Sequence, residues 1–367
     1  MKTEKKTQRE PFIRIVKRDN LTTKKKALIY AIALVGGLLL ASIVCTVFSN
    51  KDPISFFGSM LSGAFASPRK IWILLRDTAL LLGVSLALVP SFKMKFWNLG
   101  GNGQVLVGCL ATVACMYYFG GKLPDGVVVL MMIVSSVLAG AVWAVIPAIF
   151  KALFNTNESL FTLMMNYIAQ GLVAASITVW VKSGSGVLLP LPSGHMPELL
   201  NEHFLTILVF FLICVLMHGY LKYSKQGYEI SVVGESQNTA KYIGINVKKV
   251  IIRTLVLSGA ICGLVGLFIG GAINYTVNIG SANNMGFTGI MTAWLANFNP
   301  FMMVLSCLFI TFTSLGMEQV RQSFGFLNNA IANFVIGLIY FCVIACSFFI
   351  SYRVVFRKKE KNDKEVA

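Results

Sequence analysis

The sequence predicts an all-α, polytopic integral membrane protein with about ten transmembrane helices that form two inverted helical repeats. The first observation is composition: hydrophobic residues make up 56% of the 367 positions, charged residues 13%, and mean hydropathy is +0.72. A soluble globular domain carries about 25% charged residues. The second is a series of apolar stretches long enough to cross a bilayer. The third is a pair of Gly/Asn-rich interruptions, at residues 98–104 and 278–288.

The basic residues indicate membrane topology and not a nucleic-acid site. The formal net charge is +17, but ten Lys or Arg lie within residues 1–26 and six more lie from Arg353 onward. Lys and Arg are enriched in cytoplasmic loops and tails, where they also contact anionic lipid. We therefore expect a cytoplasmic arm at 1–26, a transmembrane domain at 27–350 and a cytoplasmic tail at 351–367. Membrane lipid is an expected partner, and nucleic acid is not.

The apolar stretches set the expected order of the spans. Residues 54–65 form a separate apolar patch that is expected to lie along the membrane interface. The eighth span is short, and it is counted as a crossing helix because two cytoplasmic ends require an even number of crossings. The ten expected spans are 27–48, 71–90, a third that ends near 118, 126–150, 160–181, 204–221, 250–275, 289–298, 301–315 and 328–350.

The two Gly/Asn-rich interruptions each follow the first helix of a four-helix set, spans two to five and seven to ten. Glycine is a poor helix former, and broken backbone at membrane depth is tolerated only inside protein or along a water-filled path. Paired interruptions in inverted repeats indicate a transport path between the repeats. The alternative is an ordinary helix start whose glycines pack against a neighbour. Asn166 and Gln170, four residues apart on one helix face, either bond neighbouring helices or face such a path.

The seventh span carries a stripe of glycines, and a long polar segment precedes it. A stripe without side chains lets another helix backbone approach closely. The segment at 222–249 is polar and basic, so it must lie in water, on the cytoplasmic side. We expect its first part to be a loop in which Gly234 ends the apolar run at 230–233. Glu235, Ser236 and Asn238 are then able to cap a short helix from Ala240 that Gly244 ends. It is either an ordinary loop or a docking helix for a soluble partner. The stripe is Gly259, Gly263, Gly266 and Gly270.

The sequence lacks the residues that several classes of function require. The eight Cys and three His show no metal-ligand spacing and no HExxH pattern, so no catalytic residue, metal or cofactor is expected. There is no GxxxxGK[ST] phosphate-binding loop, and the spans lack the chains of Asp, Glu or His typical of proton-coupled pumps. What remains is a membrane path and a docking segment, which suits a pore subunit driven by a separate motor.

Three stretches carry a resemblance to a known family. FWNLGGNGQVLVG, from residue 96, resembles an NIGxEGQ-type segment; TNESLFTLMMNYIA, from 156, and GESQNTAKYIGINVKKVIIRTLVLSGAICGLVG, from 234, resemble two further family stretches. The family is the permease subunits of bacterial ABC importers for nucleosides and simple sugars, of the branched-chain and ribose type, served by basic-membrane-protein-type lipoproteins. The likeness covers residues 70–350. Asn102 stands where the family usually has Glu, and Ser236-Gln237 where Asn-Pro is common.

The resemblance implies a nucleoside permease of the bacterial cytoplasmic membrane, worked by an ABC ATP-binding subunit that hydrolyses ATP. It also implies a second permease subunit, identical or related, and an extracellular substrate-binding lipoprotein. The alternatives are a monosaccharide permease of the same kind and an ion-coupled secondary transporter. Trp294 is expected to stack on a base. The residues expected to hydrogen-bond sugar hydroxyls or base edges are Asn98, Asn102, Gln104 and Asn166. Those expected to couple to the ATPase are Gly234, Glu235, Ala240, Lys241, Tyr242 and Gly244.

Overall fold

The computed structural model describes residues 13–17, 23–49, 51–182, 184–326 and 330–356. Most of the expected arm and tail therefore lie outside the described residues. The chain forms two compact units, one of Met1–Gly63 with Ser314–Ala367 and one of Ala64–Thr313. Apart from one strand pair, the described secondary structure of both units is helical, so the all-α, polytopic class is confirmed. The described strands are β1 (Ile13–Lys17) and β2 (Tyr352–Phe356), an antiparallel pair with Ile15 opposite Val354.

The first unit contains three helices and the end of a fourth. α1 (Thr23–Ser49) packs against α13 (Ala330–Ser351). α2 (Pro53–Phe65) corresponds to the expected interfacial patch, and its 13 residues are too few to cross a bilayer as a helix. It meets the last part of α12 (Pro300–Phe324), because a Cβ on Gly63 would lie 2.8 Å from the carbonyl oxygen of Leu315.

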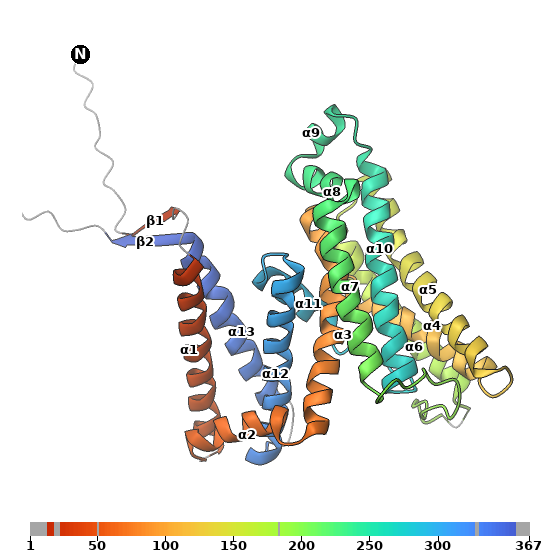
Figure 1. Cartoon of the computed structure of the whole chain (residues 1–367), viewed down its shortest axis with the longest axis horizontal. Coiled ribbons are helices and arrows are strands. Elements are labelled where there is room, and N and C mark those ends of the chain that lie inside the picture. Colours follow the sequence, from red (N-terminus) through yellow and green to blue (C-terminus); the bar gives the residue numbers. More distant parts are fainter. Residues whose placement is uncertain (1–12, 18–22, 50, 183, 327–329, 357–367) are drawn as a thin grey trace, which may run out of the picture. The chain divides into compact units, whose positions relative to one another are not determined.

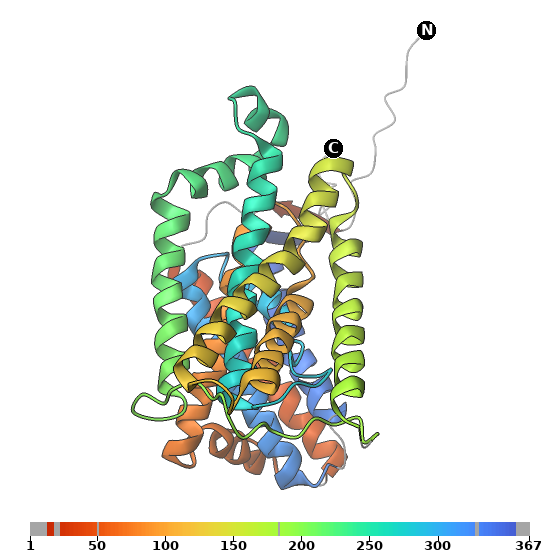
Figure 2. The same ribbon diagram turned by 90° about the vertical axis from the view of Figure 1, so that its right-hand side faces the viewer.

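The second unit is a bundle around α10, with two short helices at one end (Figure 1). Figure 2 shows α10, in teal, running through the middle of the bundle and crossing α5. The helices are α3 (Pro68–Lys93), α4 (Gly101–Phe119), α5 (Asp125–Phe154), α6 (Glu158–Trp180), α7 (Phe204–Tyr223), α8 (Lys225–Glu235), α9 (Gln237–Tyr242), α10 (Val247–Phe268), the π-helical η1 (Ile269–Ile273), α11 (Met285–Leu295) and the first part of α12.

Eight helices of the described chain are long and apolar enough to cross a membrane, which makes this a multi-pass membrane protein. They correspond to the expected spans one to seven and nine. The eighth expected span begins at Met285, earlier than predicted, and has 11 residues. At 1.5 Å per residue it is about 16 Å long, which is half the thickness of a bilayer core. Irregular backbone at 274–284 precedes it. The count of ten crossings stays a prediction.

The glycine stripe of α10 lies where other helix backbones come closest. A Cβ on Gly259 would lie 2.2 Å from the carbonyl oxygen of Gly140 in α5, and one on Gly263 would lie 2.2 Å from that of Ser136. A Cβ on Gly266 would lie 2.3 Å from the carbonyl oxygen of Val105 in α4. Cβ atoms do not approach backbone this closely, so only glycine allows α10 to sit at this distance from α4 and α5.

The polar segment 222–249 differs from the prediction, because its first part is a helix and not a loop. Ser224 Oγ accepts a hydrogen bond from the Gly227 N–H at 3.0 Å and starts α8. Gly234 does not end the apolar run. It lies inside the last turn of α8, where an added Cβ would be 2.0 Å from the carbonyl oxygen of Lys93. The predicted short helix exists as α9, capped by Ser236 Oγ, which accepts from the Thr239 N–H at 3.2 Å.

The long connection between α6 and α7 packs over the other end of the bundle. The Met196 N–H donates to the carbonyl oxygen of Gly271 at 2.9 Å, and the Leu191 N–H to that of Tyr275 at 2.8 Å. His195 stacks on Tyr275 with ring centroids 3.9 Å apart. Residues 182–203 therefore hold η1 and the start of the irregular segment 274–284 in place.

Candidate functional site

The two Gly/Asn-rich interruptions meet inside the second unit. α3 ends at Lys93, irregular backbone follows, and α4 begins at Gly101. The Gly286 N–H, in the first turn of α11, donates to Asn102 Oδ1 at 2.7 Å across a sequence separation of 184 residues. A Cβ on Gly286 would lie 2.5 Å from the Asn102 backbone nitrogen. The first interruption is shorter than predicted, because Asn102 and Gln104 belong to the first turn of α4.

A cavity of about 250 Å³ lies beside this junction, between α4, α6 and the irregular segment 274–284. Its lining residues come from these three elements, and none of them carries a charged or aromatic side chain. Two of the five predicted path residues, Asn102 and Asn166, line it. Gln170 lines it as well, one turn along α6 from Asn166, as their spacing suggests. The complete lining is Asn102, Leu106, Asn166, Gln170, Ile279, Gly280, Ala282, Asn283 and Asn284.

Asn166 uses both ends of its amide to hold α6 against the broken backbone before α4. Its Oδ1 accepts from the Gly103 N–H at 2.7 Å, and its Nδ2 donates to the carbonyl oxygen of Leu99 at 2.9 Å. One turn earlier, Thr162 Oγ1 accepts from the Leu99 N–H at 3.1 Å. A buried backbone break needs such partners, because unpaired amide groups in the membrane interior are costly.

Asn98 and Gln104 do not line the cavity. Both are buried, and they contact each other and α10: Asn98 Nδ2 donates to Ser258 Oγ at 3.2 Å, and Gln104 Nε2 donates to Asn98 Oδ1 at 3.3 Å. This closed amide and hydroxyl network ties the break to α10. Nothing in the sequence around Ser258 marks it as the third member, because one serine in an apolar helix is common.

Trp294 also lies away from the cavity. Its ring centroid is 5.7 Å from that of Trp97 and 6.2 Å from that of Phe298, and Phe92 stacks on Phe298. These four side chains form an aromatic cluster between the end of α3 and the end of α11. The indoles of Trp97 and Trp294 are about half exposed in this chain.

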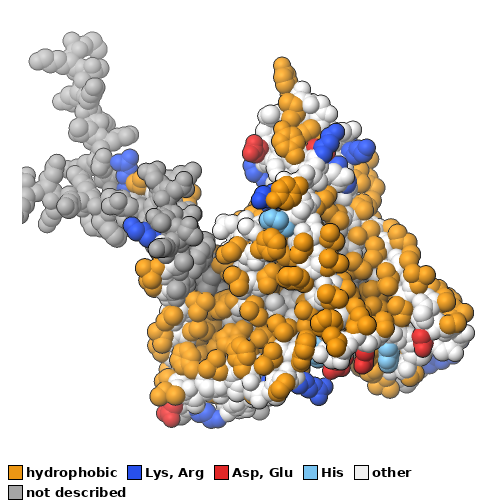
Figure 3. Space-filling model, viewed as in Figure 1, with side chains coloured by type: hydrophobic (Ala, Val, Ile, Leu, Met, Phe, Trp, Pro, Cys, Tyr) orange, Lys and Arg blue, Asp and Glu red, His pale blue; other side chains and the backbone are white. Residues whose placement is uncertain are grey.

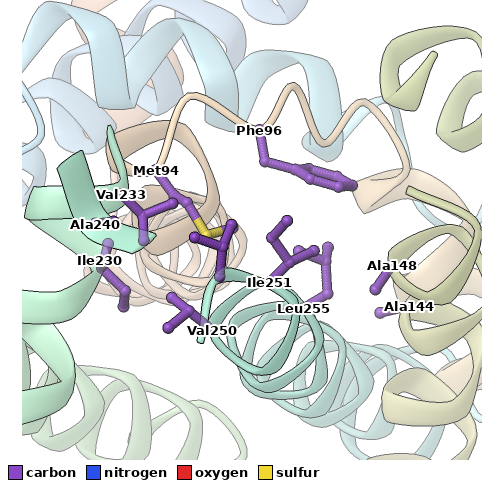
Figure 4. Packing of buried hydrophobic residues seen from close by; sticks show 11 residues of the cluster. Met94, Phe96, Ala144, Ala148, Ile230, Val233, Ala240, Val250, Ile251 and Leu255 are labelled. Atoms are coloured by element: carbon purple, nitrogen blue, oxygen red, sulfur yellow. The ribbon is translucent and has the colours of Figure 1, made fainter. Parts of the chain in front are cut away.

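The helices α8 and α9 are joined to the broken backbone by one apolar cluster, the junction cluster (Figure 4). Met94 and Phe96 come from the connection between α3 and α4, and they are 2% and 3% exposed. Five residues separate Phe96 from Asn102 in the cavity wall. The other buried members are Ile230 and Val233 of α8, Ala240 of α9, Val247, Val250, Ile251 and Leu255 of α10, and Ala144 and Ala148 of α5.

The outer face of α9 is exposed and basic. The side chain of Tyr242 is 94% exposed, and Lys241 beside it is also exposed. Lys248 and Lys249, at the start of α10, add to the charge. Figure 3 shows Lys and Arg side chains gathered at this end of the second unit, while apolar side chains cover most of its helices. Of the predicted coupling residues, Gly234 and Ala240 are buried, and Glu235, Lys241, Tyr242 and Gly244 are exposed.

A multi-pass helical bundle with two interrupted stretches of backbone beside a cavity, and an exposed helix pair at one end, is the architecture of a membrane permease. Residues 71–344 match the sequence profile of the family described as branched-chain amino acid transport system / permease component, and the chain belongs to this family.

Several curated relatives are similar over most of their length. The chain is 29% identical to the guanosine ABC transporter permease protein NupP of Bacillus subtilis (strain 168) over 277 residues, which is 73% of this chain and 79% of the relative. It is 25% identical to the nucleoside ABC transporter permease protein NupB of Lactococcus lactis subsp. cremoris, covering 90% and 92%. It is 26% identical to the glucose ABC transporter permease protein TsgB13 of Haloferax volcanii, covering 87% and 86%.

Proposed function

We propose that this chain is the transmembrane permease subunit of an ATP-driven ABC importer that carries nucleosides across the bacterial cytoplasmic membrane. The observation that carries the proposal is the junction cluster, through which the exposed α8 and α9 pack directly on the broken backbone beside the cavity. Membership of the permease family supports the transport role. Two relatives named for guanosine and nucleosides support the substrate class.

The chain supplies the path, and the motor is separate. ATP is hydrolysed on an ABC ATP-binding subunit that docks on the exposed face of α9. A second permease subunit, identical or related, completes the pore, and an extracellular lipoprotein delivers the solute. The basic residues around α9 support a cytoplasmic location for this end, and the basic residues near both termini support the same side for them. The connection 182–203 then faces the outside.

Coupling follows from the packing. A push on Tyr242 and Lys241 displaces α9, and Ala240 on its inner face transmits the displacement to the junction cluster. Because protein interiors are close-packed, Met94 and Phe96 must then shift with α8 and α9. That shift reaches the first turn of α4, where Asn102 holds Gly286 of α11. The same motion therefore opens or closes the cavity between the two interruptions.

Replacing both Lys241 and Tyr242 by Ala tests the docking role. Uptake of radiolabelled inosine into vesicles that contain the complete complex should fall by roughly tenfold or more, because hot-spot aromatic and basic side chains carry most of the energy of such contacts. ATP hydrolysis should continue without transport. Lys122→Ala, at the opposite end of the bundle, is the control and should behave like wild type. Unchanged uptake in the double variant would contradict the docking role.

A monosaccharide permease is the second candidate, favoured by the glucose permease among the relatives. Competition decides between the two: excess unlabelled inosine should abolish uptake of labelled inosine, and excess ribose should leave it unchanged. Uptake of labelled ribose that excess ribose abolishes and excess inosine leaves unchanged would indicate a sugar permease. Uptake that survives removal of ATP while an ion gradient is kept would instead indicate a secondary transporter.

A further inference from the structure

We propose that the cavity between α4, α6 and residues 279–284 is the solute site, and that Asn102 and Gln170 select an uncharged, hydroxyl- or amide-rich ligand up to the size of a nucleoside. This proposal rests on the proposed function. It adds the position of the solute site, the residues that bind the solute and the chemical property by which they select it. The structure decides between the two alternatives for Gln170 by placing it in the cavity wall, and it adds Asn283 and Asn284.

The amides that line the cavity divide into occupied and free groups. Both ends of Asn166 are hydrogen-bonded to backbone, and Asn102 Oδ1 accepts from Gly286. Among the described residues, no hydrogen bond involves Asn102 Nδ2 or the side-chain amide of Gln170. Both residues line an open cavity, so these groups are available to a solute.

The bond from Gly286 also determines which way the Asn102 amide points. A backbone N–H donates only to an oxygen, so Oδ1 must face Gly286 and the Nδ2 donor is left over. The geometry is therefore set before a ligand arrives, which lowers the entropic cost of binding. Gln170 offers one donor group and one acceptor from α6.

The composition of the wall indicates the chemical class. Carboxamides donate and accept hydrogen bonds, as do ribose hydroxyls and the edges of nucleobases. Within the part of the chain that the structure describes, no lysine, arginine or histidine lines the cavity, so a phosphate group would lose its hydration without gaining a counter-charge. No aromatic ring lines it either, so recognition here depends on hydrogen bonds and not on stacking.

Residues 279–284 complete the site from the side of the connection 182–203. Asn283 and Asn284 adopt left-handed backbone conformations, with φ of 41° and 53°, which asparagine tolerates better than most residues. Asn284 also starts α11, which Gly286 ties to Asn102. The exposed side chains of both asparagines lie at the rim, where a solute enters or leaves.

Two near-isosteric variants test the selection rule. Asn102→Asp keeps the oxygen that accepts from Gly286 but replaces the free Nδ2 donor by a carboxylate oxygen. Gln170→Glu likewise replaces the amide donor by a carboxylate oxygen, and it removes no hydrogen bond found among the described residues. Because the new carboxylate of Asn102→Asp would lie in the first turn of α4 and beside that of α11, helix dipoles favour the charge and the fold should keep its melting temperature. Each variant should lose roughly tenfold or more in inosine uptake by the complete complex.

Asn166→Asp is the matched comparison, because it removes a donor that serves the protein itself. Its contact with the Leu99 carbonyl oxygen would become a repulsion between two oxygens, so its melting temperature should fall. Gln170→Leu provides a second variant that removes the hydrogen bonds without adding charge, and it should lose uptake to a similar degree. Wild-type uptake in Asn102→Asp, Gln170→Glu and Gln170→Leu would overturn the proposal.

A labelling measurement gives a readout that does not depend on transport. Ile279 lines the cavity, is 50% exposed and is not one of the two selecting residues, so Ile279→Cys in the purified complex should react with a maleimide above the background of the wild-type cysteines. Inosine should slow that reaction. Inosine 5′-monophosphate at the same concentration should not. Equal protection by both, or by neither, would overturn the assignment. If the wild-type complex took up no inosine at all, the proposed function would fail first, and the two failures are thus distinguishable.

Discussion

Gly263 illustrates how much a single position decides at the scale of the residue. Its α-carbon faces the carbonyl oxygen of Ser136, and the three- and four-residue spacing of the stripe continues the close backbone contact along α10. Sequence spacing alone predicts such a stripe, because residues four apart share a helix face. Which helix lies against it is not encoded in that spacing. The structure places α5 against Gly259 and Gly263, and α4 against Gly266 and Gly270.

Gly263→Ala should destabilise the protein by about 1–3 kcal/mol, because a methyl group 2.2 Å from backbone oxygen forces α5 and α10 apart. The measurement is thermal unfolding of the purified complex followed by intrinsic fluorescence. Gly171→Ala is the matched control: this glycine also lies in a helix, α6, but no atom lies within 4 Å of its added Cβ. The control should be neutral or slightly stabilising, since Ala favours helix. Equal melting temperatures for the two variants would contradict the packing account.

At the scale of the element, an ion pair joins α8 to α10. Arg253 Nη2 lies 2.9 Å from Glu229 Oε2, and both side chains are mostly buried, at 25% and 17% exposure. The sequence predicts a docking segment at this position but not the helix α8, because Gly227 and Gly234 within eleven residues suggest a loop. Packing overrides that local preference: Ile230 and Val233 enter the junction cluster, and both glycines lie against backbone.

Glu229→Arg should uncouple ATP hydrolysis from uptake, because it leaves two cations facing each other in a mostly buried place and detaches α8 from α10. The loss in transport should be roughly tenfold or more. The exchange Glu229→Arg with Arg253→Glu should recover a large part of it. Uptake and ATPase rates in vesicles give the ratio of solute moved to ATP used. A double variant no better than the single one would show that the pair does not act as this link.

At the scale of the whole molecule, the distribution of lysines sets the expected orientation in the membrane. Basic residues gather around α9 and near both termini, whereas the connection 182–203 contains a single lysine. The structure places α9 and this connection at opposite ends of the second unit. Together these observations support a cytoplasmic α9 and an external connection.

Cysteines introduced at Lys248 and at Leu189 should therefore react with a membrane-impermeant maleimide from opposite sides of the membrane. Leu189 is 75% exposed and should be labelled in intact cells, and Lys248 only after the membrane is opened. The eight natural cysteines are buried or partly buried, which keeps the background low. Labelling of both positions from the same side would overturn the orientation.

The sequence by itself determined the class of this protein. The lengths of the apolar stretches, the charge bias and the glycine spacing are properties of short stretches, and they can be read without knowing which other segments pack against them. It also located both interruptions and the polar segment 222–249. Tertiary structure alone decided which polar groups face the cavity. Asn98, Asn102 and Gln104 lie within seven positions, but Asn102 and Gln104 point about 200° apart on a helix. Only the packing of α6, α10 and α11 around α4 decides that Asn102 faces the cavity and that Gln104 accepts a hydrogen bond from Ser258.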